Sequence, residues 1–140
     1  MPGLIDKAQA VGLVRRFIDS ELPKESWYQE IKDHLMAVVL YGSVAKGTDR
    51  PDSDIDILLF MPIKIEEKHT AGEYFYSFEG REVNIVIRSI EGLRKIAKDG
   101  NDPFQREVFR DSEIVWEDLT GEVSNLILSV RDNIPMSWPK

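Results

Sequence analysis

The sequence contains no cysteine and only two histidines, His34 and His69, among its 140 residues. Disulfide bonds and thiolate metal ligands are therefore excluded, and a histidine-based metal site is not expected. No apolar run approaches the ~20 residues that a membrane-spanning helix needs. The first residues also lack the basic-then-apolar order of a signal peptide. These absences predict a cytoplasmic protein in which any bound metal ion is held by oxygen ligands.

Positive charge is scarce, because 18 Lys and Arg stand against 25 Asp and Glu, for a formal net charge of −7. Proteins that bind long nucleic acids neutralise phosphates with dense Lys and Arg. We therefore expect neither extended nucleic acid nor a membrane as a partner, and a small substrate or a protein fits better. The length and the 42% hydrophobic content suit a single domain over residues 1–140.

Hydrophobic periodicity predicts an alternation of helices and strands that is typical of an α+β fold. Ser89 is a plausible N-cap for one of the helices, and Glu79-Gly80 has the two-residue spacing of a β-hairpin. The expected helices cover residues 4–22, 26–35, 89–98, 104–109 and 120–133. The expected strands cover residues 36–41, 54–61, 73–78 and 81–87, with a short edge strand at 114–117.

Two aspartates, Asp54 and Asp56, open the second expected strand on either side of Ile55. Side chains alternate across a strand, so both carboxylates are predicted to project to the same face, ~7 Å apart along the strand. Paired like charges need a counter-charge, since one of the two is otherwise pushed toward protonation. Hard cations such as Mg²⁺ prefer these oxygen ligands, so the pair predicts a magnesium site.

The preceding loop combines glycines, a hydroxyl and a cation at the end of the first apolar strand. Gly42 and Gly47 let the backbone approach a ligand closely, Ser43 offers a hydroxyl, and Lys46 supplies positive charge. This composition predicts a cradle for triphosphate oxygens. A Gly-Ser turn alone, or an alternating aspartate pair alone, is more often structural. Their conjunction within one short stretch is much more specific.

From Gly42 to Asp56 the sequence resembles the signature of the DNA polymerase beta nucleotidyltransferase superfamily, in which Gly-Ser is followed after about ten residues by Asp-x-Asp. Length and element order are similar to those of its minimal nucleotidyltransferases. The resemblance implies a nucleotidyltransferase fold, a small mixed β-sheet of four to five strands with helices packed mainly on one face. It also implies that Gly42 and Ser43 contact the triphosphate and that Asp54 and Asp56 hold Mg²⁺.

The activity implied by this resemblance is Mg²⁺-dependent transfer of a nucleoside monophosphate, AMP from ATP being the expected case, to an acceptor. Active members usually carry a third carboxylate on the neighbouring strand, where this chain has Asn84. Glu82, two residues earlier on the same strand face, is the candidate substitute that activates the acceptor. The family also often has arginines where this chain has Val44 and Lys46, so one cation remains.

Several acceptors and one non-catalytic function stay open. Minimal nucleotidyltransferases are often paired with a HEPN-type protein as toxin and antitoxin, which makes such a protein a candidate partner. Adenylylation of a small molecule usually requires a second domain, for which the chain has no room. The alternative of a different class is a catalytically weak or silent relative that acts as an antitoxin-like partner-binding module.

Overall fold

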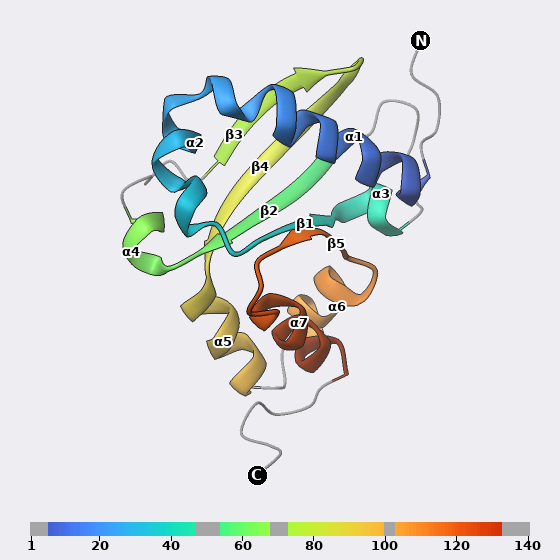
Figure 1. The fold of residues 1–140 in the computed structure, drawn as a ribbon. Helices are drawn as coiled ribbons and strands as arrows, with labels where there is room; N and C mark the ends of the chain where they lie inside the picture. The colour runs from blue at the N-terminus through green and yellow to red at the C-terminus, as the bar shows by residue number, and fades with distance from the viewer. Residues whose placement is uncertain (1–5, 47–53, 68–72, 100–102, 133–140) are drawn as a thin grey trace.

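The computed structural model describes residues 6–46, 54–67, 73–99 and 103–132 (Figure 1). The helices are α1 (Lys7–Ser20), α2 (Ser26–Ile31), α3 (Gly42–Lys46), α4 (Ile63–Glu66), α5 (Ile90–Asp99), α6 (Pro103–Arg110) and α7 (Glu122–Asp132), with short 3₁₀ helices at Leu22–Lys24 and Lys32–His34. The strands are β1 (Ala37–Tyr41), β2 (Ile55–Met61), β3 (Glu73–Phe78), β4 (Arg81–Ser89) and β5 (Glu113–Glu117). Each helix and strand expected from the sequence is present. Among the described residues, no helix combines the length and apolar character needed to cross a membrane.

The five strands form one mixed sheet in the order β3-β4-β2-β1-β5. β2 and β4 run parallel, and the other neighbouring strands run antiparallel. β2 therefore lies in the middle of the sheet, and β5 lies at one edge, as its sequence predicted. The predicted α+β fold class with a mixed sheet of four to five strands is confirmed.

The β3–β4 hairpin turns at Glu79 and Gly80, which have φ angles of +50° and +80°. Two successive positive φ angles are characteristic of the tight turn whose twist matches that of antiparallel strands. The hairpin fixes the register of β4, in which Asn84 lies opposite Phe75 of β3. The short local turn thus sets which residues of β3 and β4 lie opposite each other.

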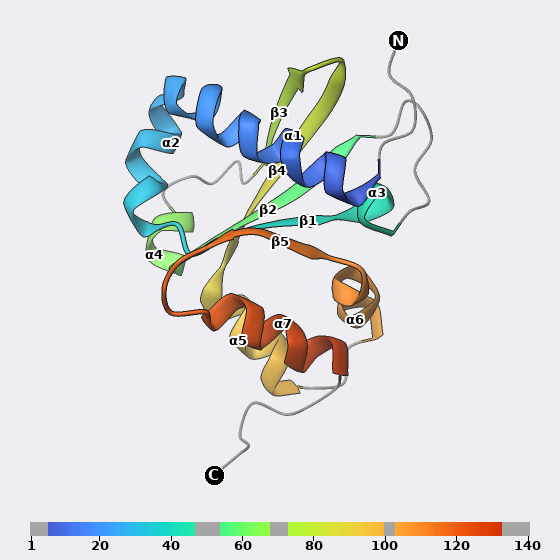
Figure 2. The same cartoon turned by 45° about the vertical axis from the view of Figure 1, so that its right-hand side comes forward.

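Helices cover both faces of the sheet rather than mainly one (Figures 1 and 2). On the closed face, defined by Ile55 and Ile57, α1, α2 and α3 complete a continuous apolar core. On the opposite carboxylate face, defined by Asp56 and Leu58, α5, α6 and α7 pack over a second core. The difference from the expectation has a simple cause. The central strands are apolar on both sides, so each side needs a cover.

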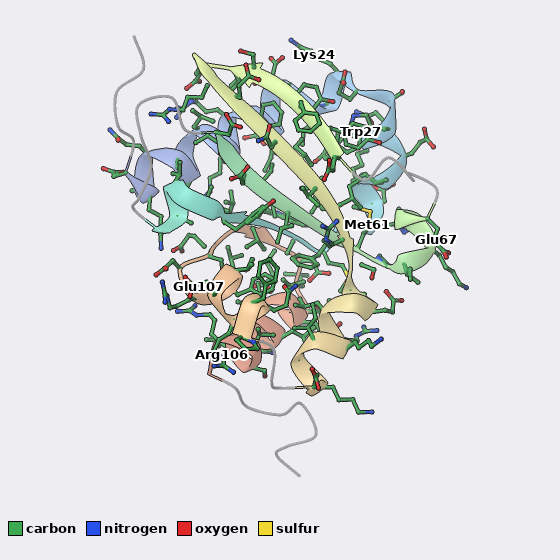
Figure 3. The ribbon with its side chains drawn as sticks, turned by 180° about the vertical axis from the view of Figure 1, so that it is seen from behind. Lys24, Trp27, Met61, Glu67, Arg106 and Glu107 are labelled. Carbon is green, nitrogen blue, oxygen red and sulfur yellow. The ribbon has the colours of Figure 1, made fainter. Side chains whose placement is uncertain are left out.

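Aromatic side chains join α2 to β3 at one end of the closed face. The Trp27 ring (Figure 3) stacks on Tyr74, with ring centroids 4.0 Å apart and an interplanar angle of 5°. The Trp27 indole nitrogen donates a hydrogen bond of 2.9 Å to the Tyr76 hydroxyl, which itself donates one of 2.6 Å to Glu25. These contacts give all three aromatic residues a packing role.

Candidate functional site

Asp54 and Asp56 lie at the N-terminal end of β2, where the central strand enters the sheet. Ile55, between them, is fully buried in the core of the closed face. Asp56 is half-buried on the opposite side, and Asp54 is exposed just before the strand begins. The alternation expected from the sequence therefore places an aspartate pair on the carboxylate face at the N-terminal end of β2. This is the end of the sheet away from α5, which follows the C-terminal end of β4.

Asn84 brings the two aspartates together. It lies opposite Asp56 in the parallel register of β2 and β4. Its side-chain nitrogen donates a hydrogen bond of 2.9 Å to Asp54 Oδ2 and one of 3.2 Å to Asp56 Oδ1. One oxygen of each carboxylate thus points to the same small volume beside β4. The carboxylates form a convergent pair, held together by the side-chain amide of Asn84.

The electrostatics of the pair favour a positive ligand. Burial raises the pKa of Asp56 above its ordinary value, the hydrogen bond from Asn84 acts in the opposite direction, and the charge of Asp54 raises the pKa again. Burial and the neighbouring acid thus both disfavour the ionised form of Asp56. A cation between the carboxylates reverses this balance, because it stabilises the ionised form of both.

Gly42, the first residue of α3 directly after β1, lies against Asp56. Its φ angle is +81°, a conformation that side chains disfavour. A Cβ atom added here would collide with Asp56 Oδ2 and would lie 3.2 Å from Asp56 Cγ. Only glycine therefore lets the Asp56 carboxylate lie this close to the backbone, and the contact of Gly42 with a triphosphate stays a prediction.

The remaining residues predicted for the site are described only in part. Ser43 and Lys46 belong to α3, directly after Gly42, and Gly47 lies outside the described residues. Glu82 is exposed on β4, two residues before Asn84. Within the described ranges, no group of three or more His, Cys, Asp or Glu is placed to hold a metal ion. Glu82 therefore does not form a three-carboxylate group with Asp54 and Asp56, and its catalytic role stays a prediction.

The donor set of the site suits magnesium. Asp54 and Asp56 offer hard carboxylate oxygens, and Asn84 carries an amide oxygen that a rotation of its side chain would present instead of the nitrogen. Proteins usually bind Mg²⁺ through one or two carboxylates, with substrate phosphates and water completing the octahedron. Two converging carboxylates are thus sufficient protein ligands for a magnesium–triphosphate complex.

Sequence reasoning did not find a pocket of about 320 Å³ that lies on the carboxylate face, between the sheet and helices α5 and α6. Tyr41, which lies opposite Asp56 in the β1–β2 register, forms one wall. Burial and the charge of Asp56 raise the pKa of Tyr41, whereas the charge of Arg88, another wall residue, lowers it. The pocket therefore begins next to Asp56, although neither aspartate is among its lining residues. The sequence did carry one signal for this wall of the pocket, because strand alternation puts Arg88 on the same face of β4 as Asn84.

Comparisons with known proteins show the family and the fold of the chain. A family model of the nucleotidyltransferase domain matches residues 25–114, well over half of the chain, and this range includes Gly42, Asp54, Asp56 and Asn84. No curated protein matches the chain.

Two solved structures are similar to the chain. A nucleotidyltransferase-like protein from Exiguobacterium sibiricum 255-15 is 12% identical, with a TM-score of 0.55, over 91% of this chain and 40% of that protein. The present chain thus spans less than half the length of that protein and shares its fold. A toxin-antitoxin with AMP-PNP is 18% identical over 76% of this chain and 79% of that one, but its TM-score of 0.37 is too low to establish a shared fold. The family match and the shared fold lead to one identification: the chain belongs to the nucleotidyltransferase domain family.

Proposed function

We propose that this protein transfers AMP from ATP to an acceptor in a Mg²⁺-dependent reaction, with Asp54 and Asp56 as the metal ligands. The observation that carries the proposal is the convergence of the two carboxylates on one point, 2.9 Å and 3.2 Å from the Asn84 side-chain nitrogen. Membership of the nucleotidyltransferase domain family supports nucleotidyl transfer in general. The choice of ATP and Mg²⁺ rests on the family resemblance and on the donor set.

The residues of the chain mainly position charge. Gly42 lacks the Cβ atom that would displace the Asp56 carboxylate, and its bare backbone is the proposed contact of the triphosphate. When bound, Mg²⁺ would neutralise the negative charge of the phosphates and of the two aspartates. The acceptor oxygen attacks the α-phosphorus, the bond between this phosphorus and the bridging oxygen to the β-phosphate breaks, and pyrophosphate leaves. A carboxylate oxygen of Glu82 is the proposed recipient of the acceptor proton.

The direct test uses ATP labelled at the α-phosphorus, Mg²⁺ and the candidate acceptor. We expect the α-label on the acceptor, loss of transfer on chelation of Mg²⁺, and no transfer of label from the γ-position. Transfer that persists in EDTA would contradict the metal assignment, and incorporation of the γ-label would indicate a different reaction. The proposed acceptor is a protein partner of the HEPN type, which the family resemblance suggests.

A catalytically weak or silent partner-binding module is the second candidate, and Asn84 is the observation that favours it. An amide cannot accept a proton as a carboxylate does and binds Mg²⁺ less strongly. The two candidates predict different results for three proteins, the parent, Glu82→Gln and Asn84→Asp.

Loss of transfer in Glu82→Gln alone would support Glu82 as the substitute acid. Transfer that appears only in Asn84→Asp would support a degenerate site, whose natural role is binding. Strong parental activity that Glu82→Gln leaves unchanged would contradict the assigned role of Glu82. Mg²⁺-dependent ATP binding, measured beside the transfer assay, separates a silent site that still holds nucleotide from one that has lost it.

A further inference from the structure

The surroundings of Asp56 restrict where each part of a bound nucleotide can lie. On the β1 side, Gly42 packs so closely against the carboxylate that an added Cβ atom would collide with Asp56 Oδ2. On the β4 side, Asn84 and Glu82 occupy the same strand face. Along β2, the next residue on the carboxylate face is Leu58, which lines the pocket. This strand step is ~7 Å long. The pocket therefore begins one strand step from Asp56 along the direction of β2.

The stereochemistry of phosphoryl transfer assigns the first two directions. The attacking and leaving oxygens lie roughly in line on opposite sides of the phosphorus. If the β- and γ-phosphates lie beside Gly42, as the proposed function requires, the acceptor approaches from the opposite side, over β4. The nucleoside then has to leave the α-phosphate in a third direction, and the direction along β2 leads into the pocket.

We propose that this pocket, between the sheet and helices α5 and α6, binds the nucleobase of the nucleoside triphosphate donor. The inference rests on the proposed function and names a subsite for the same substrate. The volume of about 320 Å³ is at the lower end of the range of ligand pockets, about 300–1,000 Å³. It suits one ring system rather than a complete nucleotide, whose phosphates then remain at the carboxylates.

The chemistry of the pocket suits a planar heterocycle. Its floor is apolar, with Leu58 and Phe60 from β2 and Leu93 from α5, all of them buried. Arg88 of β4 supplies N–H donors, which match the carbonyl oxygens and ring nitrogens of bases. Apolar walls with a small number of polar groups are typical of sites for small organic ligands.

Phe104, at the start of α6, is the most informative wall residue because it is 70% exposed although it is a large aromatic side chain. It adds little to the core, which α6 reaches instead through the buried Phe109. Figure 3, in which Arg106 and Glu107 mark α6, shows this helix below the sheet, on the same side as α5. An exposed ring beside an apolar pocket offers a stacking surface, and base–aromatic stacking is tolerant of base identity.

The test compares binding of ATP with binding of inorganic tripolyphosphate, both with Mg²⁺, to the full chain and its variants. Tripolyphosphate can use the carboxylates and the glycine but has no base. We expect Phe104→Ala to raise the Kd of ATP roughly tenfold and to leave the Kd of tripolyphosphate unchanged. Ile96→Phe, which adds volume at the pocket wall, should have the same selective effect. Leu119→Ala, fully exposed and outside the pocket, is the matched control and should change neither Kd.

The outcomes separate this inference from the proposed function. An unchanged Kd of ATP in both Phe104→Ala and Ile96→Phe would overturn the base pocket, while Mg²⁺-dependent binding of tripolyphosphate by the parent would still support the phosphate site. Slower transfer with unchanged ATP binding would assign the pocket to the acceptor and would also overturn the inference. A parent that binds neither ligand would contradict the proposed function itself.

Discussion

The two sides of β2 carry out different tasks with residues that alternate along one strand. On the closed face, Ile55 and Ile57 are fully buried and pack against α1 and α3. On the carboxylate face, Asp54 is exposed and Asp56 is half-buried, beside a pocket rather than a filled core. Hydrophobic burial on one side thus holds the strand rigidly enough to position polar groups on the other. Rigid strands hold reacting groups more precisely than loops do.

The aromatic residues of the helices also pack differently on the two faces of the sheet. On the closed face, Phe17 of α1 contacts the rings of Tyr76 and Phe78, each with a centroid distance of 5.4 Å. On the carboxylate face, the corresponding pair is Phe60 and Phe109, 6.5 Å apart, and both line the pocket. The carboxylate face therefore combines a packed region under α7 with an open region near the aspartates. Substitutions on the closed face should therefore lower stability, whereas substitutions beside the aspartates should lower activity.

The largest effects are expected for adjacent residues on opposite faces. Ile57→Ala should lower the free energy of unfolding by about 2–5 kcal/mol, because it leaves a cavity in the closed core. Asp56→Ala should abolish nucleotidyl transfer without lowering that free energy, since burial and Asp54 already raise the pKa of this carboxyl and disfavour its charge. Urea unfolding measures the first quantity, and release of pyrophosphate from ATP measures the second. Asp54→Ala should behave like Asp56→Ala.

Three results would contradict this division of tasks between the two faces of β2. Transfer at the parental rate in Asp56→Ala would contradict the metal-ligand assignment. A loss of several kcal/mol in Asp56→Ala would show that this side of the strand also carries the stability of the fold. A small loss in Ile57→Ala would show that the closed face can rearrange to fill the cavity.

Local sequence signals predicted most of the fold. The Glu79-Gly80 turn follows from its two-residue spacing between two strand-like segments, and the cap at Ser89 follows from one side chain next to a helix start. The aspartate pair was also predictable, because the alternation of side chains on one strand needs no knowledge of its neighbours.

Features that depend on pairing between distant segments were not predictable in this way. The parallel pairing of β2 with β4 places Asn84 against both aspartates, although 28 residues separate it from Asp56. The placement of helices on both faces and the pocket between β2, α5 and α6 depend on the same nonlocal packing. Phe104 lies in a helix that was predicted, but its sequence does not show that the ring borders a pocket beside Asp56.

An effect of intermediate size is expected at Gly42. Two glycine variants distinguish the strain of a positive φ angle from the loss of the nucleotide site. Gly42→Ala should abolish binding of ATP, because its Cβ collides with the Asp56 carboxylate. Gly80→Ala is the matched control, since Gly80 has nearly the same φ angle but no atom within 4 Å of an added Cβ. Both variants should lose about 1 kcal/mol of stability from the positive φ, and only Gly42→Ala should lose nucleotide. Isothermal titration with Mg²⁺ and ATP measures the difference, and equal ATP affinity in the two variants would refute the cradle.

A smaller effect is expected at the start of α5, the helix that follows β4 over the carboxylate face. The Ser89 hydroxyl accepts a 2.9 Å hydrogen bond from the Gly92 backbone nitrogen. Ser89→Ala should therefore lower the free energy of unfolding by about 1 kcal/mol. Ser20→Ala is the control, because the Ser20 hydroxyl at the end of α1 donates to the Arg16 carbonyl and caps no helix start; its change should stay within about 0.5 kcal/mol. Thermal or urea unfolding that ranks the two variants in the reverse order would contradict the capping role.

The smallest effect concerns the closed face at high pH. Burial, followed by the hydrogen bond that its hydroxyl donates to Glu25, raises the pKa of Tyr76 to about 12, although the hydrogen bond from Trp27 acts in the opposite direction. The unfolded chain, with an ordinary tyrosine pKa of about 10, therefore loses this proton first as the pH rises. The contribution of Tyr76 to stability is complete below pH ~10 and is lost progressively up to pH ~12. Tyr76→Phe cannot titrate, so the difference in free energy of unfolding between parent and variant should shrink from pH 9 to pH 11. Urea unfolding across this interval measures the difference, and a constant gap would show that the proton of Tyr76 is not coupled to folding.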